Sequence, residues 1–300
     1  MRILNLPLSR SNVDRSAHLR SDESALEAIW EHASILHFNG EAFLTSGANL
    51  RFLAAHEISG DGLRIYLGEH EERHYFLWSV EGSYSEAENA YKTLREFGSE
   101  LTALEIGLAV HGQGVALWHA RNPFCSYCGK ELQPALAGSV RRCENAHEQY
   151  PRTDPAIIVL TKDSDDRILL GRQGVWPEHR FSTFAGFVES GESFEQCVVR
   201  EVFEEAGVHV TDIHYLGSQP WPFPQSLMIA FEATITDPQN ARADGEEIVD
   251  IRWFTRDGLH QAMLDGTLLL PPSMSVARAM IQAWYGEDRP ALPGSQSWRP

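Results

Sequence analysis

The segment 186–208 constrains the fold of this chain most, because it carries the signals of one complete helix. Ser193 is a residue type that caps helix N-termini, and Gly207 follows a run of good helix formers. We therefore expect a helix from Ser193 to about Ala206 that the glycine ends. A helical wheel gathers the apolar residues on one face, which predicts the side that is buried: Val199, Val202, Phe203 and Ala206.

The other face of the predicted helix carries three glutamates. Glu201, Glu204 and Glu205 are spaced i, i+3 and i+4, so they share one face. Like charges at this spacing destabilise a helix unless a cation compensates them. Carboxylate oxygens suit Mg²⁺ or Mn²⁺, hard ions that also bind water and phosphate, and Arg200 can brace a neighbouring glutamate. A solvated acidic face is the alternative for any Glu-rich turn alone.

The residues around the three glutamates favour the metal-binding interpretation. The segment has the pattern Gly186-x5-Glu192-x7-Arg200-Glu201-x2-Glu204-Glu205-x-Gly207, with aliphatic Val202 and Val208. This pattern resembles the signature of the Nudix hydrolases, which cleave a nucleoside diphosphate linked to another group. The resemblance implies an α/β/α sandwich with a mixed sheet, metal on the box glutamates and attack of water at phosphorus. It implies catalytic roles for Arg200, Glu201, Glu204 and Glu205.

Composition is that of an ordinary globular protein. The chain has 300 residues, of which 43% are hydrophobic and 22% charged, which predicts about two domains with a sizeable core. No apolar run approaches about 18 residues and the first residues do not resemble a signal peptide, so we expect a cytoplasmic protein without membrane helices. The net charge of −17 disfavours nonspecific binding of polyanions, but a small anionic substrate is compatible if metal ions neutralise it.

A proline-rich segment follows ten residues after the box and reads SQPWPFPQS. Its alternating prolines stiffen the backbone and hold Trp221 and Phe223 as rings on which a base can stack. Composition alone leaves a structural turn or a polyproline ligand equally open. The segment resembles the signature of the NADH pyrophosphatase subfamily, which implies substrate contacts by Ser218, Gln219, Pro220, Trp221, Pro222, Phe223, Pro224 and Gln225.

The same resemblance extends to single positions on both sides of the box. Tyr150 and Ala277 match substrate-contacting positions, and Ala185 matches a residue whose carbonyl contacts metal. Glu247 matches a further metal-linked glutamate, although its surroundings, DGEEIVD, alone read as an acidic loop. The resemblance therefore implies a Mg²⁺ or Mn²⁺ site formed by Ala185, Glu201, Glu205 and Glu247. It covers residues from about 121 to 285.

Cysteine spacing predicts a second metal site. Cys125-x2-Cys128-Gly is a knuckle, and Cys143 follows after 14 residues, which suits a zinc ribbon. The subfamily usually supplies a second Cys-x2-Cys, but the three residues after Cys143 are Glu, Asn and Ala. His147 is the natural substitute and would complete a Cys₃His shell for Zn²⁺; a degenerate ribbon without metal is the alternative. We interpret Cys197, in the box helix, as buried packing.

Periodicity and composition divide the chain into four parts, which together predict an α/β (α+β) protein. They are a smaller mixed α/β N-terminal domain (1–120), the zinc ribbon (121–153), the Nudix domain (154–286) and a flexible tail (287–300). We expect helices at 25–33, within 84–121 and at 275–284. Strands are expected at 63–68, 74–80, 156–162, 167–171, 210–217, 226–235 and 248–254.

The two motifs together predict metal-dependent hydrolysis of NADH and NAD at the pyrophosphate, giving AMP and nicotinamide mononucleotide. Members of the family also remove the NAD cap from RNA. Residues 121–152 carry five basic and three acidic side chains, which fits guidance of an RNA 5′ end and a solvated ribbon surface equally well. The resemblance further implies a homodimer.

Two other functions compete with this prediction. One is a Nudix hydrolase for another nucleoside diphosphate such as ADP-ribose, which the proline-rich segment disfavours. The other is a zinc-ribbon binding protein with an inactive Nudix domain, which the intact box glutamates and Arg200 disfavour.

Overall fold

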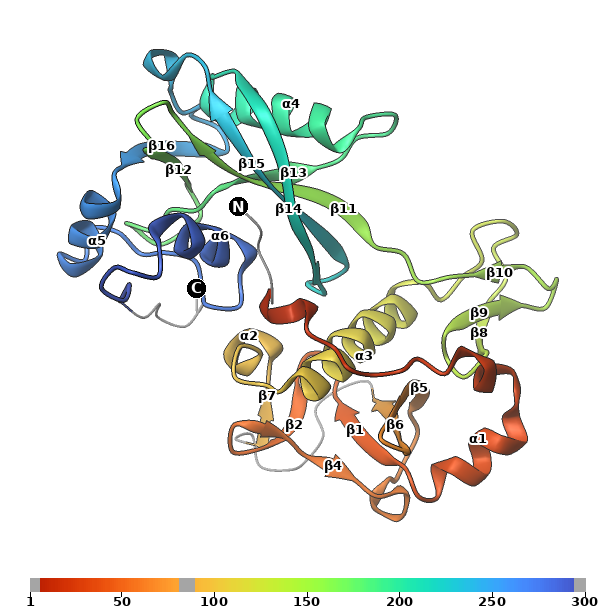
Figure 1. Ribbon diagram of the computed structural model, residues 1–300. Coiled ribbons are helices and arrows are strands. Elements are labelled where there is room, and N and C mark those ends of the chain that lie inside the picture. Colours follow the sequence, from red (N-terminus) through yellow and green to blue (C-terminus); the bar gives the residue numbers. More distant parts are fainter. Residues whose placement is uncertain (1–5, 81–89, 294–300) are drawn as a thin grey trace. The chain divides into compact units, whose positions relative to one another are not determined.

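The computed structural model describes residues 6–80 and 90–293 (Figure 1). The chain forms two compact units. The C-terminal unit comprises Met1–Pro7, Asp154–Pro220 and Ser226–Pro300, and the N-terminal unit comprises Leu8–Thr153 and Trp221–Gln225. The tip of the proline-rich segment is thus grouped with the N-terminal unit, although its two ends belong to the other.

A mixed sheet forms the centre of the C-terminal unit, which confirms the expected sheet type. The strand order is β14-β15-β11-β12-β16, and β13 also pairs with β11. Strand β11 runs parallel to β15 and antiparallel to β12 and β13. The strands are β11 (Asp154–Lys162), β12 (Ile168–Gln173), β13 (Phe184–Phe187), β14 (Val210–Trp221), β15 (Ser226–Ile235) and β16 (Ile248–Phe254).

Helices cover both faces of this sheet (Figure 1). Successive residues of a strand point to opposite faces, and β11 is buried on both. Ile157 packs in the layer of α4 (Phe194–Ala206), whereas Ile158 packs in the layer of α5 (Arg256–Leu264) and α6 (Val276–Tyr285). This arrangement confirms the predicted α/β/α sandwich.

Helix α4 begins and ends where the sequence predicts. The hydroxyl of Ser193 accepts the N–H of Gln196 at 3.2 Å, and the Gln196 side chain accepts the N–H of Ser193 at 2.9 Å. This reciprocal pair is a capping box. Gly207 adopts the left-handed conformation, with φ of +66°, that commonly ends a helix.

The predicted faces of α4 are partly wrong. Val199 and Phe203 are 38% and 46% exposed, whereas Glu205 is only 4% exposed. The side of α4 that packs inward consists of Cys197, Val198, Val202, Glu205 and Ala206. Residues 198, 202, 205 and 206 follow the spacing of one helix face, and a hydrophobicity wheel overlooks a charged member of such a stripe. The core-facing side of α4 therefore includes a carboxylate.

The N-terminal unit contains a second sheet, with the order β3-β2-β1-β6-β5; β4 also pairs with β1, and β7 with β2. Helix α1 (Glu23–Trp30) packs on the face that includes Tyr66 and Phe76. Helix α3 (Ala103–Arg121) lies on Leu77, so closely that a Cβ at Gly112 would be 3.2 Å from the leucine side chain. The strands are β1 (Ser34–Phe38), β2 (Phe43–Ser46), β3 (Asn49–Leu50), β4 (Phe52–Leu53), β5 (Leu63–His70), β6 (Arg73–Ser79) and β7 (Tyr91–Lys92).

A three-stranded sheet with the order β10-β9-β8 follows α3 in the same unit. Its strands are β8 (Leu132–Ala135), β9 (Val140–Cys143) and β10 (Glu148–Gln149). Arg141 donates to the carbonyls of His119, at 2.6 Å, and of Leu132. A basic side chain of the ribbon is thus used internally, to tie β9 to the end of α3.

The remaining described segments are short helices and the start of the predicted tail. Residues 84–89 of the segment expected to be helical lie outside the described residues, and the rest includes α2 (Leu94–Phe97) and α3. In the tail, Leu292 packs against the core and Pro293 accepts a hydrogen bond from Arg278 at 2.9 Å. Short 3₁₀ helices span Pro7–Ser9, Ala17–Ser21, Ala55–Glu57 and Pro238–Asn240. Within the described ranges, no helix has both the length and the apolarity that crossing a membrane requires.

Candidate active site

Arg200 connects the glutamates of the box. It binds Glu192 through Nε at 2.8 Å and Nη2 at 2.9 Å, and through Nη1 it binds Glu201 at 2.7 Å and Glu204 at 3.0 Å. Its hydrogen bond lowers the pKa of Glu192 to about 2, and these carboxylates raise the pKa of Arg200. The expected bracing role is confirmed, because one guanidinium ties the segment before α4 to the acidic turn.

Glu205 is the most perturbed carboxylate of the box. Burial, together with the charges of Glu247 and Glu201, raises its pKa to about 9. Its Oε2 atom is buried and has no hydrogen-bond partner among the described residues. An N–H of Ala185 acts in the opposite direction and lowers the pKa. The structure therefore brings Ala185, Glu201, Glu205 and Glu247 into one electrostatic cluster.

This cluster fits a divalent cation. Glu205 has a buried carboxylate oxygen without a partner among the described residues, and two further carboxylates act on it. Together they are hard oxygen donors of the kind that Mg²⁺ or Mn²⁺ binds. The box glutamates are spread more widely than a closed metal shell, since Arg200 holds Glu201 and the Gln173 amide holds Glu247 at 2.8 Å. Sequence reasoning missed Gln173, because its partner lies 74 residues away.

The proline-rich segment forms the end of the β14–β15 hairpin rather than a separate loop. Ser218–Trp221 complete β14, and residues 222–225 make the turn. Pro220 is tolerated because β14 is an edge strand, where one side needs no ladder hydrogen bonds. Gln219 is fully buried and donates to the carbonyl of Met274 at 3.0 Å. The base of the motif is therefore anchored to the chain just before α6.

The two aromatic rings at the hairpin tip contact each other edge to face. Trp221 and Phe223 have ring centroids 4.9 Å apart at an angle of 70°. The guanidinium of Arg95 lies 4.1 Å from the Phe223 centroid and 5.4 Å from that of Trp221. Both aromatic residues are half-buried. The pair is thus held at a fixed mutual angle, as the stiff backbone predicts.

The two outlying substrate residues differ in accessibility. Tyr150 is exposed, and its hydroxyl donates to Glu148 at 2.7 Å. Ala277 is buried in the first turn of α6, where its N–H donates to the Ser275 hydroxyl at 3.2 Å. Ala277 thus lies three residues from Met274, the residue that Gln219 contacts.

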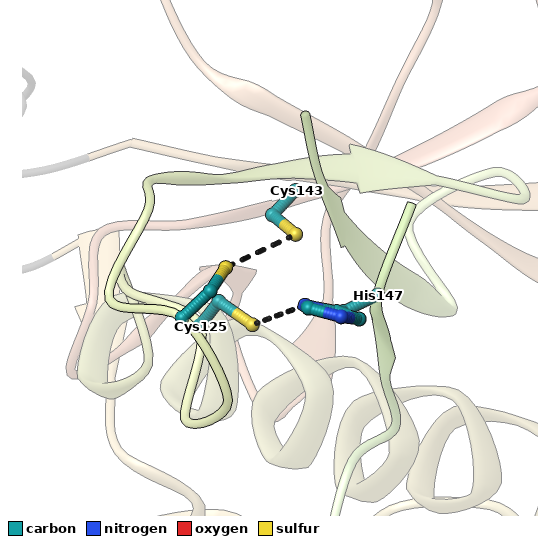
Figure 2. Close-up of side chains that lie close together, drawn as sticks. Cys125, Cys143 and His147 are labelled. Carbon is teal, nitrogen blue, oxygen red and sulfur yellow. Dashed lines mark hydrogen bonds between the residues drawn. The ribbon is translucent and has the colours of Figure 1, made fainter. Parts of the chain in front are cut away.

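The ribbon brings Cys125, Cys128, Cys143 and His147 together. Within the part of the chain that the structure describes, these form the one group of His, Cys, Asp and Glu side chains whose possible ligand atoms all lie within 4.8 Å of one another. Cys128 Sγ is 3.7 Å from Cys143 Sγ, and Cys125 Sγ is 3.6 Å from His147 Nδ1 (Figure 2). Tetrahedral Zn²⁺ with Zn–S of about 2.3 Å requires S···S separations of about 3.8 Å. The geometry therefore fits zinc, and the sulfurs are too far apart for disulfides.

Electrostatics at the ribbon agrees with a metal site. A backbone N–H of Lys130 lowers the pKa of Cys128 to about 6, which favours the thiolate that metals bind. The surface charges are largely neutralised within the ribbon: Lys130 pairs with Glu144 at 3.0 Å, and Arg142 with Glu148 at 2.5 Å.

Comparisons with known proteins assign two segments of the chain to known families. Residues 152–269 match the NUDIX domain, and residues 120–150 match the NADH pyrophosphatase zinc ribbon domain. A Mycobacterium bovis protein named NAD-capped RNA hydrolase NudC is 38% identical over 296 residues, covering 92% of this chain and 94% of that protein. A Pseudomonas aeruginosa protein of the same name is 38% identical over 210 residues, covering 68% and 72%.

A solved Nudix hydrolase from Nitrosomonas europaea is similar with a TM-score of 0.39 and 22% identity, over 45% of this chain and 78% of that one. The similarity to the Mycobacterium bovis protein extends over almost the whole chain. The chain therefore belongs to the Nudix hydrolase family, in the group whose members carry the NADH pyrophosphatase zinc ribbon.

Proposed function

We propose that this enzyme hydrolyses the pyrophosphate of NADH and NAD, releasing AMP and nicotinamide mononucleotide. The observation that carries the proposal is the buried Oε2 of Glu205, which has no hydrogen-bond partner among the described residues and lies inside an intact box. The chain also presents the ring pair of Trp221 and Phe223. The first supplies a cation site for a pyrophosphate, and the second supplies surfaces for a base.

The residues of the box and its neighbours have proposed roles in binding metal, in orienting the ligands and in accepting a proton. Glu201, Glu205, Glu247 and the carbonyl of Ala185 would hold Mg²⁺ or Mn²⁺. Such cations neutralise phosphate oxygens and favour loss of a proton from the attacking water. Arg200 fixes the orientation of Glu201 through their 2.7 Å ion pair, and Glu204 supports the same cluster from its exposed position. A glutamate of the box or Glu247 accepts the proton of the water.

Substrate specificity is assigned to the hairpin and its neighbours. Trp221 and Phe223 stack against the nicotinamide or the adenine, and Tyr150 contributes a further ring. Gln219 and Ala277 are further proposed substrate contacts, because Gln219 binds the carbonyl of Met274 and Ala277 follows Met274 in the first turn of α6. The prolines keep the hairpin end rigid, so that binding orders few additional groups.

NAD-capped RNA is a second proposed substrate, since the relatives carry that activity in their names. The hydrogen bonds and ion pairs within the ribbon weaken the expectation that its basic side chains guide an RNA 5′ end. At least three of its five basic side chains are already engaged, as Arg141 is bound to carbonyls while Lys130 and Arg142 pair with glutamates. We therefore expect the removal of an NAD cap to depend only modestly on ionic strength.

Zn²⁺ in the ribbon, a homodimer and a cytoplasmic location complete the proposal. The four ligands of the ribbon support zinc, with His147 in the place of a fourth cysteine. The cysteines are free, as expected for a reducing compartment. Light scattering on the purified chain tests the homodimer, and a monomeric mass would contradict it.

The deciding experiment compares NADH with ADP-ribose in Mg²⁺ or Mn²⁺ and identifies the products by chromatography. We expect AMP and reduced nicotinamide mononucleotide from NADH at the higher kcat/KM. A higher kcat/KM for ADP-ribose would favour the alternative Nudix substrate. Absence of hydrolysis of any dinucleotide with either metal would favour a binding protein.

Glu205→Gln tests the catalytic site within this proposal. The amide keeps the size of the side chain but removes the negative charge that a cation needs, so turnover should fall on the order of a thousandfold or more. The fold should remain, because the neutral amide suits a buried position better than a carboxylate. Circular dichroism and kcat measured on the same sample separate these outcomes, and a near-normal kcat would exclude the assignment.

A further inference from the structure

Helix α3 contributes a contact to the tip of the substrate hairpin that lies outside every motif of the sequence. Gln113, in the middle of α3, is 3% exposed, and its Nε2 donates to the carbonyl of Pro222 at 2.6 Å. The two residues are 109 positions apart, and both belong to the N-terminal unit. We propose that Gln113 is a positioning residue that sets the orientation of the Trp221 and Phe223 rings. This inference rests on the proposed function of the hairpin.

The surroundings of Gln113 make this contact selective. The amide is enclosed by the unit, and its Oε1 atom has no hydrogen-bond partner among the described residues. A buried amide that loses its hydrogen bond is strongly unfavourable, so Gln113 and Pro222 hold each other in place. A buried position of α3 that only packs would be filled by an apolar side chain, which has no hydrogen-bond donor.

The position of the bond within the hairpin turns it into a constraint on the rings. Pro222 stands between Trp221 and Phe223, and the Phe223 N–H donates to the Trp221 carbonyl at 2.7 Å. The pyrrolidine ring fixes φ of Pro222, so anchoring its carbonyl also fixes the peptide that leads into Phe223. The edge-to-face angle of 70° between the rings therefore depends on a group supplied by α3.

Gln113→Met is the sharpest test, because methionine has a similar length and removes the donor. We expect KM for NADH to rise about fivefold, the size of one ordinary hydrogen bond, while kcat stays within about twofold. The hairpin binds a base that does not react, so it stabilises the ground state and the transition state equally. The melting temperature should fall only slightly, since removal of the unpaired Oε1 offsets part of the cost of leaving the Pro222 carbonyl without its donor.

Val115→Ala is the matched control on the same helix. Val115 is buried in the unit, so its truncation should lower the melting temperature by removing core contacts, yet leave KM unchanged. Gln113→Met is thus expected to change mainly KM, whereas Val115→Ala is expected to change mainly the melting temperature. A lower melting temperature with unchanged KM in Gln113→Met would mean that Gln113 only packs, and it would overturn the proposal.

Two further measurements separate this inference from the proposed function. Titration of NADH fluorescence in chelator reports binding without turnover, and the affinity should also fall about fivefold in Gln113→Met. Amide hydrogen exchange of a peptide covering 218–226 needs no substrate, and it should be faster in the variant. Unchanged exchange and affinity would reject the role of Gln113. A wild-type chain that neither binds nor cleaves NADH would instead reject the proposed function.

Discussion

The amide of Gln173 donates to the carboxylate of Glu247 at 2.8 Å and so fixes the side chain of an acid in the acidic segment before β16. Gln173 is the last residue of β12 and pairs with Ile248, the first residue of β16, so the next residue toward the N-terminus is within reach. If Glu247 holds the metal as proposed, a partner of this kind would orient it without touching the metal.

Gln173→Leu should therefore weaken Mn²⁺ binding by about tenfold, the effect typical of losing a group that orients a ligand. Paramagnetic resonance of free Mn²⁺ measures the affinity without any substrate. Gln261→Leu is the control, because Gln261 donates to Asp265 at 2.8 Å on α5. Equal Mn²⁺ affinities for the two variants would contradict this role of Gln173.

Gly186→Ala should disable the site without unfolding it. A Cβ at Gly186 would lie 1.9 Å from the carboxylate of Glu201, so the glutamate must move. A displacement near 1 Å costs a rate factor on the order of 100. In Gly114→Ala, by contrast, the added Cβ meets nothing within 4 Å on α3, and the variant should keep full activity. The steady-state kcat of both variants is the measurement, and equal kcat values would contradict the prediction for Gly186→Ala.

His147→Ala should reduce zinc retention. The wild type is expected to hold one Zn²⁺ per chain, and loss of the fourth ligand should lower the affinity on the order of tenfold or more. Adding Ala146→Cys to His147→Ala restores the spacing Cys-x2-Cys and should restore binding. Zinc measured per chain after dialysis against a chelator gives the result, and His147 is not a ligand if the single variant retains the metal.

Stability should depend on pH through Glu192. Arg200 lowers the pKa of Glu192 from the usual 4.5 to about 2. A carboxyl whose pKa is lowered on folding stabilises the protein above pH 4.5, and this contribution is lost as the pH falls toward 2. Glu192→Gln should therefore lower the urea midpoint more at pH 6 than at pH values near 3.

The control for this measurement is Glu195→Gln, which changes an exposed residue in the first turn of α4. Its difference from the wild type should stay nearly constant over the same pH range. A constant difference for Glu192→Gln as well would show that the ion pair with Arg200 does not contribute.

Local signals in the sequence were sufficient for the box helix. Ser193 and Gly207 act on the backbone within one turn, so the ends of α4 follow from neighbouring residues alone. The burial of Glu205 was not predictable in the same way, because it depends on where the sheet lies. A pattern of hydrophobic residues reports the average polarity of a face and gives no weight to a single buried acid.

Contacts between distant segments were beyond sequence reasoning altogether. Gln113 is one glutamine in an apolar helix, and Gln173 is one glutamine at a strand end, without any recognisable spacing to their partners. The pairing of β12 with β16 would have indicated the second contact, but only once the register was known. The ribbon was predictable because its possible metal ligands lie within 23 consecutive residues, from Cys125 to His147.

The imidazole of His147 would also change the formal charge of a zinc site in the ribbon. Zn²⁺ with four thiolates carries a formal charge of −2, whereas three thiolates and one neutral imidazole leave −1. With Zn²⁺ bound, the ribbon would therefore add one negative charge fewer to a chain whose net charge is already −17. His147 in the place of a fourth cysteine would thus change the charge of the zinc site without any basic side chain.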